Sequence, residues 1–512
     1  MSRPDAPCLG AIQDPPAPRD GVALAAICLV ALMFGLEISS VPVILPTLEQ
    51  RLGTRFQDAQ WIMNAYTLAC TSVLMAAGTL ADRFGRRRVL VLSLWLFGLA
   101  SVACGLASDA RMLIAARFAQ GIGAGAMMIC QFAILSHRFR EPVARARAFA
   151  LWGVIAGVGL GFGPMVGALI LQLLDWRWVF FVHAPLTLLT LVLLDLSVAE
   201  SRNPAAQRLD VAGMTSLTLG VFCLVYFITL GTERGFAEPR MLGAAALALL
   251  GLLCFVFIER RSAHPTFDFS VFRIARFNGA LMGSVGMNLG FWPFIIYLPI
   301  YFQVGLGYST LATGLALLAY TLPALLVPPL AERLALRHGA ERIIPMGLGL
   351  VGAGFMLMAS GNRSSQPDAM LILAGCLLAG SGLGLTNSPT TNTSTGAVSP
   401  DRSGMASGID LSARLITLAL NIALMGLVLV LGIGHHLAQV LPQGTAAQWP
   451  GFSQDIAAGK LGTLVWPGQT AEEGRAVAQA ALRRGTGWAM LHAGVGSWAL
   501  ALLSRFFFRR DA

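Results

Sequence analysis

Charged side chains are scarce in this sequence of 512 residues. They make up 12% of the chain, whereas hydrophobic residues make up 56% and the mean hydropathy is +0.69. About a quarter of the residues in a soluble domain are charged, because polar groups must cover its surface. The composition therefore excludes a soluble globular protein and predicts that lipid surrounds most of the chain.

The sequence also lacks the clustered residues that enzymes, ATPases and metal proteins need. It contains no G-x-x-x-x-G-K-[ST] loop for ATP, its seven histidines are dispersed, and its eight cysteines stand singly. His435 and His436 are adjacent, but no further metal ligand lies near them in the sequence. We therefore expect no cofactor and no metal site, and a polytopic membrane enzyme becomes the weakest functional alternative.

Long apolar runs dominate the sequence instead. A bilayer core of about 30 Å needs roughly 20 apolar residues of helix. Runs of this length predict an all-α polytopic membrane protein with fourteen transmembrane helices, at about 21–45, 58–80, 88–107, 111–135, 147–171, 178–198, 209–230, 241–258, 278–303, 309–330, 343–360, 369–393, 404–433 and 488–507.

Basic residues indicate how these helices are oriented. The net charge is +10, and most of the 36 Lys and Arg residues lie in the two tails and in loops that follow even-numbered runs. Short basic clusters between apolar runs suit the cytoplasmic face of a membrane better than nucleic acid. We therefore expect both termini in the cytoplasm, membrane lipid around the helices and no nucleic-acid partner.

The most highly charged cluster is GTLADRFGRRRVL, residues 78–90, which follows the second run. Its glycines permit a tight turn, its arginines hold the turn on the cytoplasmic side, and its aspartate can pair with them or face a helix N-terminus. A plain topogenic loop would need the arginines alone. The stretch resembles the signature loop of the major facilitator superfamily, which implies a conformational latch formed by Gly78, Asp82, Arg83, Gly85, Arg86 and Arg87.

A related stretch, PPLAERLALRHGAERI (328–343), follows the tenth run. Many transporters are built from two related halves. The repeat and the resemblance together predict the major facilitator fold, with two six-helix bundles and two inserted helices. The expected parts are a cytoplasmic tail (1–20), an N-terminal six-helix bundle (21–200), inserted helices 7 and 8 (201–262), and a C-terminal six-helix bundle (263–512) with an outer loop (434–487).

Small residues recur every fourth position in the fifth run, LWGVIAGVGLGFGPMVGALI (151–170). Such a face lets a neighbouring helix approach closely, and a proline in the middle adds a bend. Helix packing alone would explain any one pair. The segment is similar to the antiporter motif G-x-x-x-G-P-x-x-G-G of drug exporters, with Gly159, Gly163, Pro164 and Gly167 in place and Ala168 for the last glycine.

One acidic residue, Glu37, lies within the first run. A carboxylate in hydrocarbon costs about 2.5–3.5 kcal/mol on insertion scales, and burial favours its protonated form. Alternatively, Glu37 lies near the outer end, in contact with water. The segment LEISSVPVILPTL (36–48) resembles the L-D-x-T-I-V-N-V-A-L-P pattern of fourteen-helix drug:proton antiporters of the QacA and EmrB type. Glu37 takes the place of the aspartate in that pattern.

A single arginine, Arg117, lies within the fourth run and needs a partner there. Glu37 is the nearest candidate in kind, so the two predict a proton-coupling site. A purely structural ion pair is the alternative. The spacing from Arg117 to Gln120 and Gly121 matches the helix 4 motif of the family, in which the arginine is implied in proton transfer.

Three further segments extend the resemblance: WIMNAYTLA (61–69), DWRWVFFVHAPL (175–186) and SGMASGIDLSARL (403–415). His183 and Asp410 stand where the family usually has asparagine. Asp410 and Arg414 are one helical turn apart, and we expect a surface-level pair near the cytoplasmic start of helix 13.

The outer loop, 434–487, contains a capping-box pattern followed by a glycine. Thr470 with Glu473 predicts the start of a short amphipathic helix, and Gly485 predicts its end. Such a helix would cover the outer opening of the transporter or contact a partner. A solvent-exposed segment with no such role is an equal alternative.

These features favour a proton-coupled efflux antiporter in the bacterial inner membrane that exports lipophilic, cationic drugs or toxic compounds. A dedicated exporter of one metabolite on the same fold remains the alternative, and a periplasmic adaptor protein as partner is left open. Aromatic and Met-rich walls suit flat lipophilic cargo. Candidate cavity residues are Asn64, Tyr66, Gln131, Asn288, Phe291, Trp292, Tyr297 and Asn387, and the alternative for each is packing between helices.

Overall fold

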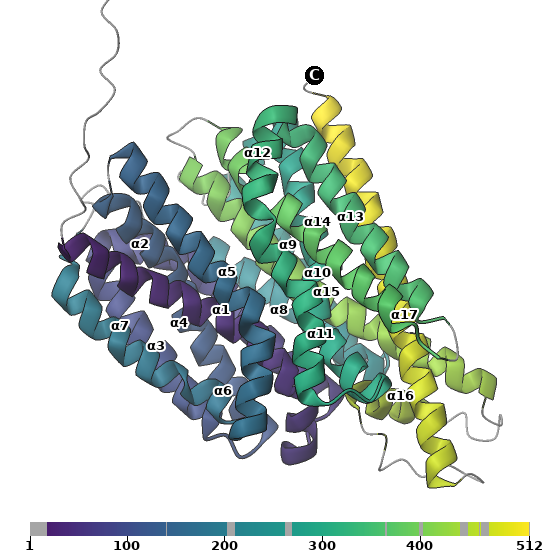
Figure 1. The fold of residues 1–512 in the computed structure, drawn as a ribbon. Coiled ribbons are helices and arrows are strands. Elements are labelled where there is room, and N and C mark those ends of the chain that lie inside the picture. Colours follow the sequence, from purple (N-terminus) through teal and green to yellow (C-terminus); the bar gives the residue numbers. More distant parts are fainter. Residues whose placement is uncertain are drawn as a thin grey trace, which may run out of the picture.

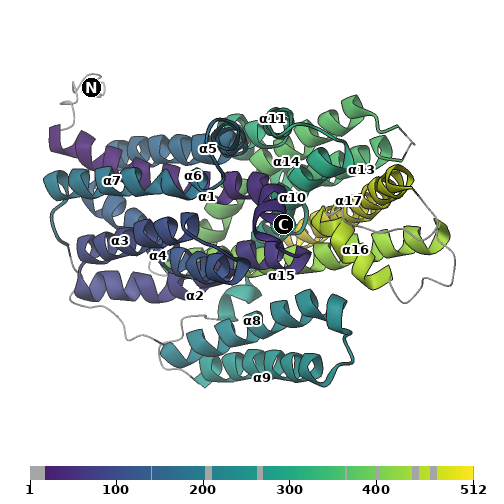
Figure 2. The same cartoon turned by 90° about the horizontal axis from the view of Figure 1, so that it is seen from below.

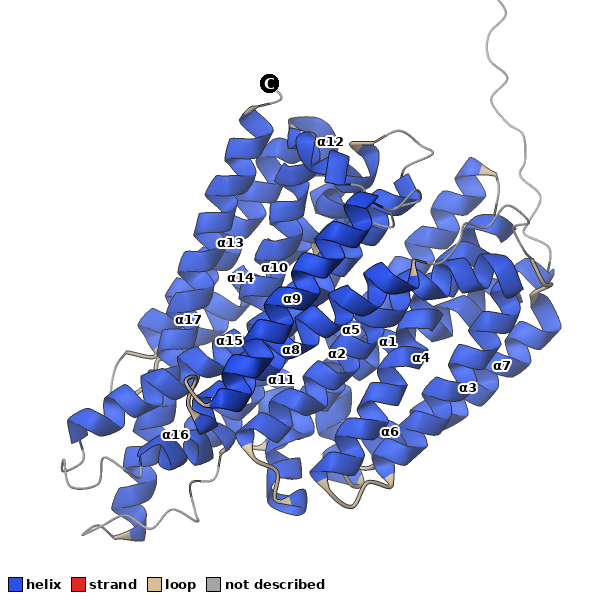
Figure 3. Cartoon of the chain, turned by 180° about the vertical axis from the view of Figure 1, so that it is seen from behind, coloured by secondary structure: helices blue, strands red, loops and turns tan. Residues whose placement is uncertain are grey.

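The computed structural model describes residues 18–139, 141–201, 210–261, 269–363, 366–398, 403–440, 449–459, 461 and 470–510. Helices make up most of this part of the chain, and it contains no strand (Figure 3). The helical elements are α1 (Pro18–Leu52), α2 (Phe56–Phe84), α3 (Arg86–Gly105), α4 (Ala110–Arg138), α5 (Pro142–Leu173), α6 (Trp178–Phe181), α7 (His183–Ser197), α8 (Val211–Arg234), α9 (Pro239–Arg261), η1 (Phe269–Arg273), α10 (Ala275–Ile300), η2 (Tyr301–Gly305), α11 (Thr310–Leu326), α12 (Pro328–His338), α13 (Ala340–Gly361), α14 (Ala369–Gly396), α15 (Ser403–Val440), α16 (Trp449–Ala458) and α17 (Ala471–Arg509).

Every apolar run coincides with one helix or with two consecutive helical segments. By length and composition, 12 described helices can cross a membrane, or 13 if α11 and α12, which meet at 44°, form one bent span. The α2 helix is not among them, although its 29 residues are long enough to span a bilayer. The all-α membrane architecture is confirmed, and the fourteenth span stays a prediction for which α2 is the candidate.

The helices gather into two groups and a separate pair (Figures 1 and 2). In the first group α1 packs on α5, and α4 packs on both α2 and α3. In the second group α13 packs on α14 and α17, and α17 also packs on α10. Figure 2 shows α8 and α9 together at one edge, where α8 contacts α2 and α15. The domain boundaries given above remain predictions.

Several polar contacts between the two groups lie at one end of the molecule. This distal end is where α1 ends and α2 begins, whereas Figure 1 shows the start of α1 and the end of α17 toward the opposite end. At the distal end, Gln60 Nε2 donates to Tyr297 Oη at 2.9 Å and to the carbonyl of Ile422 at 3.3 Å. Gln303 Nε2 donates to the carbonyl of Val43 at 3.2 Å. These bonds close the distal end of the interface.

The last helix is longer than the sequence suggests. The capping box is confirmed, because Glu473 Oε2 accepts from the Thr470 N–H at 2.8 Å and Thr470 Oγ1 accepts from the Glu473 N–H at 3.3 Å. The predicted end at Gly485 is wrong, since α17 continues through it to Arg509. A Cβ at Gly485 would lie 2.6 Å from the carbonyl oxygen of Leu429, so this glycine permits close packing on α15 and does not cap a helix.

Candidate functional site

The two charged residues found inside apolar runs meet in the interior of the first helix group. Glu37 of α1 and Arg117 of α4 have no exposed side-chain surface, and Arg117 Nη1 pairs with Glu37 Oε1. Arg117 Nε donates to the carbonyl of Ile62 at 3.0 Å, and its Nη1 donates to Gln120 Oε1 at 2.7 Å. Burial of Glu37 excludes the alternative of an acid in contact with water.

The glycines of α5 allow α1 to approach closely enough to carry Glu37 into this position. A Cβ at Gly159 would lie 2.7 Å from the carbonyl oxygen of Leu32, and a Cβ at Gly167 would lie 2.8 Å from that of Ser40. A Cβ at Gly163 would collide with the side chain of Ser39. Any larger residue on this face would push α1 away.

The other side of α5 contacts the second helix group. Thr321 of α11 donates its hydroxyl to the carbonyl of Gly161 at 2.5 Å. Pro164 lies inside α5, and its carbonyl oxygen lies 3.3 Å from the place of a Cβ on Gly314 of α11. The antiporter-motif segment thus joins the helix that carries Glu37 to the other group of helices.

Two further side chains surround the buried ion pair. His183, the first residue of α7, is fully buried, and its Nδ1 lies 3.3 Å from Glu37 Oε2. The Arg117 guanidinium lies over the Tyr66 ring, 4.3 Å from its centroid. Sequence reasoning noted His183 only as a replacement for asparagine, and a histidine at the start of an apolar helix gave no further signal.

A small cavity of about 30 Å³ lies between the two helix groups, beside this cluster. Two of the eight residues expected to line a cavity, Tyr66 and Trp292, do line it. Its wall is almost entirely apolar and comes from α1, α2, α10 and α15. The lining residues are Phe34, Ile38, Met63, Tyr66, Thr67, Cys70, Trp292, Ile295, Ile296, Leu415, Leu418 and Ile422.

The remaining expected cavity residues lie in helix contacts. Gln131 accepts from Trp152 Nε1 at 2.9 Å, and Phe291 stacks on Tyr320 with ring centroids 4.0 Å apart. Tyr297 closes the distal end, as described above. Asn64 is fully buried, and neither polar atom of its side chain has a hydrogen-bond partner within the described residues.

The glycine–arginine loop between α2 and α3 is anchored by a residue that sequence reasoning missed. Gly85 has φ = 116°, a conformation that favours glycine. The Glu200 carboxylate accepts from the N–H groups of Arg87 and Arg88, at 3.1 Å each, and so caps the N-terminus of α3. Arg83 is exposed, and the side chain of Asp82, the acid expected at such a helix end, lies outside the described residues.

Two more residues of this loop complete the set named from the sequence. The Arg86 N–H donates to the carbonyl of Ser201 at 3.0 Å, which adds to the anchor at Glu200. Gly78 lies inside α2 and not in the turn, so its expected part in a tight turn is wrong. A Cβ there would be 3.5 Å from the Ile129 side chain, in ordinary contact with α4.

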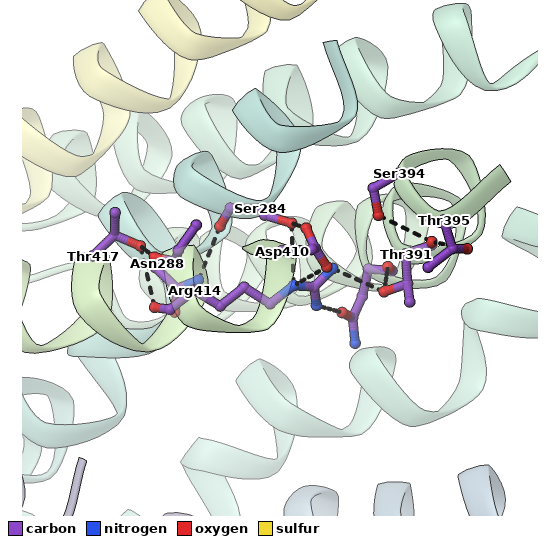
Figure 4. Close-up of polar contacts among 10 residues, drawn as sticks. Ser284, Asn288, Thr391, Ser394, Thr395, Asp410, Arg414 and Thr417 are labelled. Carbon is purple, nitrogen blue, oxygen red and sulfur yellow. Dashed lines mark hydrogen bonds and ion pairs between the residues drawn. The ribbon is translucent and has the colours of Figure 1, made fainter. Parts of the chain in front are cut away.

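The second helix group contains a partly buried network centred on Arg414 (Figure 4). Arg414 Nε donates to Asp410 Oδ2 at 3.0 Å and to Ser284 Oγ at 3.1 Å. Its Nη1 donates to Asn387 Oδ1 at 2.6 Å, and its Nη2 donates to Thr391 Oγ1 at 2.9 Å. The expected surface-level pair is wrong, because α10 and α14 cover Asp410, whose side chain is 4% exposed.

The last expected cavity residue, Asn288, lies at the edge of this network. Its Nδ2 donates to the carbonyl of Ser284 at 2.9 Å, and its own carbonyl accepts from Asn421 at 3.1 Å. Asn288 and Asn387 therefore both serve contacts among α10, α14 and α15.

Comparisons with known proteins identify the family of the chain. A model of the major facilitator superfamily matches residues 27–420. The multidrug resistance protein Stp of Mycobacterium tuberculosis is 34% identical over 426 residues, which cover 82% of this chain and 79% of that protein. The puromycin resistance protein pur8 of Streptomyces alboniger is 32% identical over 434 residues, covering 84% and 85%.

Solved structures share the fold. A bacterial homologue of the human lysosomal transporter Spinster, in an inward-facing and unoccupied conformation, aligns with a TM-score of 0.66 at 17% identity, over 97% of this chain and 99% of that chain. A D-xylose–proton symporter aligns with a TM-score of 0.60 at 16% identity, over 86% and 96%.

Proposed function

The chain belongs to the major facilitator superfamily, and on that premise we propose that it is a proton-coupled efflux antiporter. It exports lipophilic, cationic drugs or toxic compounds across the bacterial inner membrane, with both termini in the cytoplasm. The observation that carries the proposal is the fully buried pair of Glu37 and Arg117, separated from an apolar cavity by the ring of Tyr66. The names of its relatives support drug export.

Competition between a proton and a cation follows from the charges around the cavity. With Glu37 ionised, its charge and that of Arg117 cancel. A proton on Glu37 leaves a net positive charge beside a cavity with an apolar wall, where charges interact strongly. A cationic cargo is then repelled, so proton and cargo occupy the protein in turn, as antiport requires.

Tyr66 transmits this competition, because one residue touches both sites. Its ring lies under the Arg117 guanidinium and lines the cavity. An aromatic face attracts a cation, and Arg117 and a cationic cargo compete for the same ring. Protonation of Glu37 frees Arg117 to interact more strongly with Tyr66, which weakens binding of cargo.

The proton gradient supplies enough energy for this exchange, and no cofactor or catalytic residue is needed. One proton that enters down about 150 mV supplies roughly 3.5 kcal/mol, which sustains a cargo gradient of about 300-fold. The exchange requires the two helix groups to rock against each other. We assign this movement to the interface of α5 with α1 and α11, where glycines permit close contact.

The test is transport of a fluorescent lipophilic cation, ethidium, into inverted membrane vesicles. Vesicles with wild-type protein should accumulate ethidium when their interior is made more acidic than the outside, and a proton ionophore should abolish this accumulation. Glu37→Gln should abolish it as well, whereas Glu472→Gln, at an exposed acid of α17, should transport like wild type. Equal transport by Glu37→Gln and wild type would contradict the proposal, as would accumulation that survives the ionophore.

A further inference from the structure

His183 occupies an unusual position for a histidine inside a membrane protein. It has no exposed surface, and within the described residues neither ring nitrogen has a hydrogen-bond partner. Its Nδ1 lies 3.3 Å from Glu37 Oε2, which also lacks a hydrogen-bond partner there. Phe97 of α3 meets the imidazole in a T-shaped contact, with ring centroids 5.5 Å apart. A buried polar group without a partner is costly and calls for an explanation.

We propose that His183 is the second proton-binding group of the coupling site. This inference rests on the proposed function and assigns the route of its proton. A proton binds to the imidazole and gives an imidazolium, which then donates from Nδ1 to Glu37 Oε2. The proton moves between these two atoms while it is held, and its departure leaves a neutral imidazole beside the carboxylate.

The other groups around Glu37 cannot take this role. Arg117 of α4 already occupies Oε1, and a guanidinium does not release its proton in proteins. Tyr66 of α2 and Cys104 of α3 lie in the same cluster, against Arg117 and Gln120, but both are weak acids whose ordinary pKa values lie above neutral pH. Imidazole is the side chain that gains and loses a proton in this range. His183 is therefore the group suited to pass a proton to Glu37 Oε2.

The direction of the effect follows from the charges. An imidazole next to a carboxylate increases the proton affinity of the pair, because the imidazolium that forms is attracted to the carboxylate. Without His183, the proton must bind to a carboxylate that is already paired with Arg117. We therefore expect a variant without His183 to take up less proton at a given pH.

The experiment measures proton release from purified protein in lipid nanodiscs when ethidium is added, between pH 5.5 and 8.5 in weak buffer. His183→Asn should still bind ethidium, but its proton release should shift to lower pH by about one unit, a roughly tenfold loss near pH 7.5. His492→Asn is the matched control, since His492 is a partly buried histidine of α17 whose Nε2 lies 3.4 Å from Asn421. It should keep the wild-type profile.

A second measurement needs no variant at position 183. In wild-type protein labelled with ¹⁵N-histidine, ethidium at constant pH should change the protonation state of one imidazole. Unchanged imidazole resonances would overturn the proposal, and so would a wild-type release profile in His183→Asn. If wild-type protein releases no proton on binding ethidium and shows no gradient-driven transport, the proposed function fails instead.

Discussion

Each helix group holds one arginine beside one buried carboxylate, and the two pairs differ in their neighbours. Around Arg414 every nitrogen of the guanidinium has a hydrogen-bond partner, and both oxygens of Asp410 are bonded. Around Arg117, one nitrogen of the guanidinium, Glu37 Oε2 and both nitrogens of His183 have none in the described part of the chain.

This difference separates a structural pair from a functional one. A network in which every polar group is bonded fixes its helices and resists change of any member. In an incompletely bonded cluster, an arriving proton adds a hydrogen bond where none existed. We therefore assign stability to the Arg414 network and proton exchange to the Glu37 cluster.

The strongest test of this comparison is to remove each arginine in turn. Arg117→Gln should lower gradient-driven ethidium transport by about 100-fold or more, because loss of its charge removes roughly 3 kcal/mol of coupling to Glu37. Transport into inverted vesicles, normalised to the amount of folded protein, measures the effect. Near-wild-type transport by Arg117→Gln would remove the ion pair from the mechanism.

A second test moves the helix that carries Glu37 without touching a charge. Gly159→Val should push α1 away from α5 at an overpacking cost of about 2 kcal/mol, or roughly 30-fold in the transport rate. Gly153→Val is the control, since a Cβ at Gly153 has nothing within 4 Å. If both variants transport equally, the close approach of α1 and α5 is not needed.

A third test concerns the aromatic ring of Tyr66, whose centroid lies 4.3 Å from the Arg117 guanidinium. Tyr66→Leu should lower transport about tenfold, because a desolvated cation–π contact contributes about 1–2 kcal/mol. Tyr66→Phe keeps the ring and should stay within about threefold of wild type. The ratio of the two rates is the informative quantity, and a ratio near one would show that the ring itself is dispensable.

The smallest effect on transport is expected at the bonded network. Arg414→Gln should cost about 3–5 kcal/mol of stability, because it leaves Asp410 buried without a cation. Transport by the protein that remains folded should stay within about threefold of wild type. Thermal unfolding in detergent and vesicle transport measure the two quantities. A variant that is stable but inactive would reverse the assignment of roles.

Local signals in the sequence predicted most of the fold. Hydropathy located a helix at each predicted span, because a membrane span is defined by its own composition. Gly485 shows where this fails: a glycine that caps a helix and one that lets helices pack look alike until the neighbouring helix α15 is known.

The site was predictable where a single residue was anomalous. Glu37 and Arg117 stand out as charges in apolar runs, and they pair across 80 residues of sequence. His183 begins α7 and Glu200 lies in the loop after that helix, where polar residues are ordinary, so their roles depend on distant helices. The burial of Asp410 likewise comes from α10 and α14, which an i,i+4 spacing does not reveal.

Proton release on cargo binding tests the central claim most directly. Ethidium added to purified wild-type protein in weak buffer should release a proton, and Glu37→Gln should release none while it still binds ethidium. Equal release by both proteins, or binding to the wild type without any release, would contradict the account.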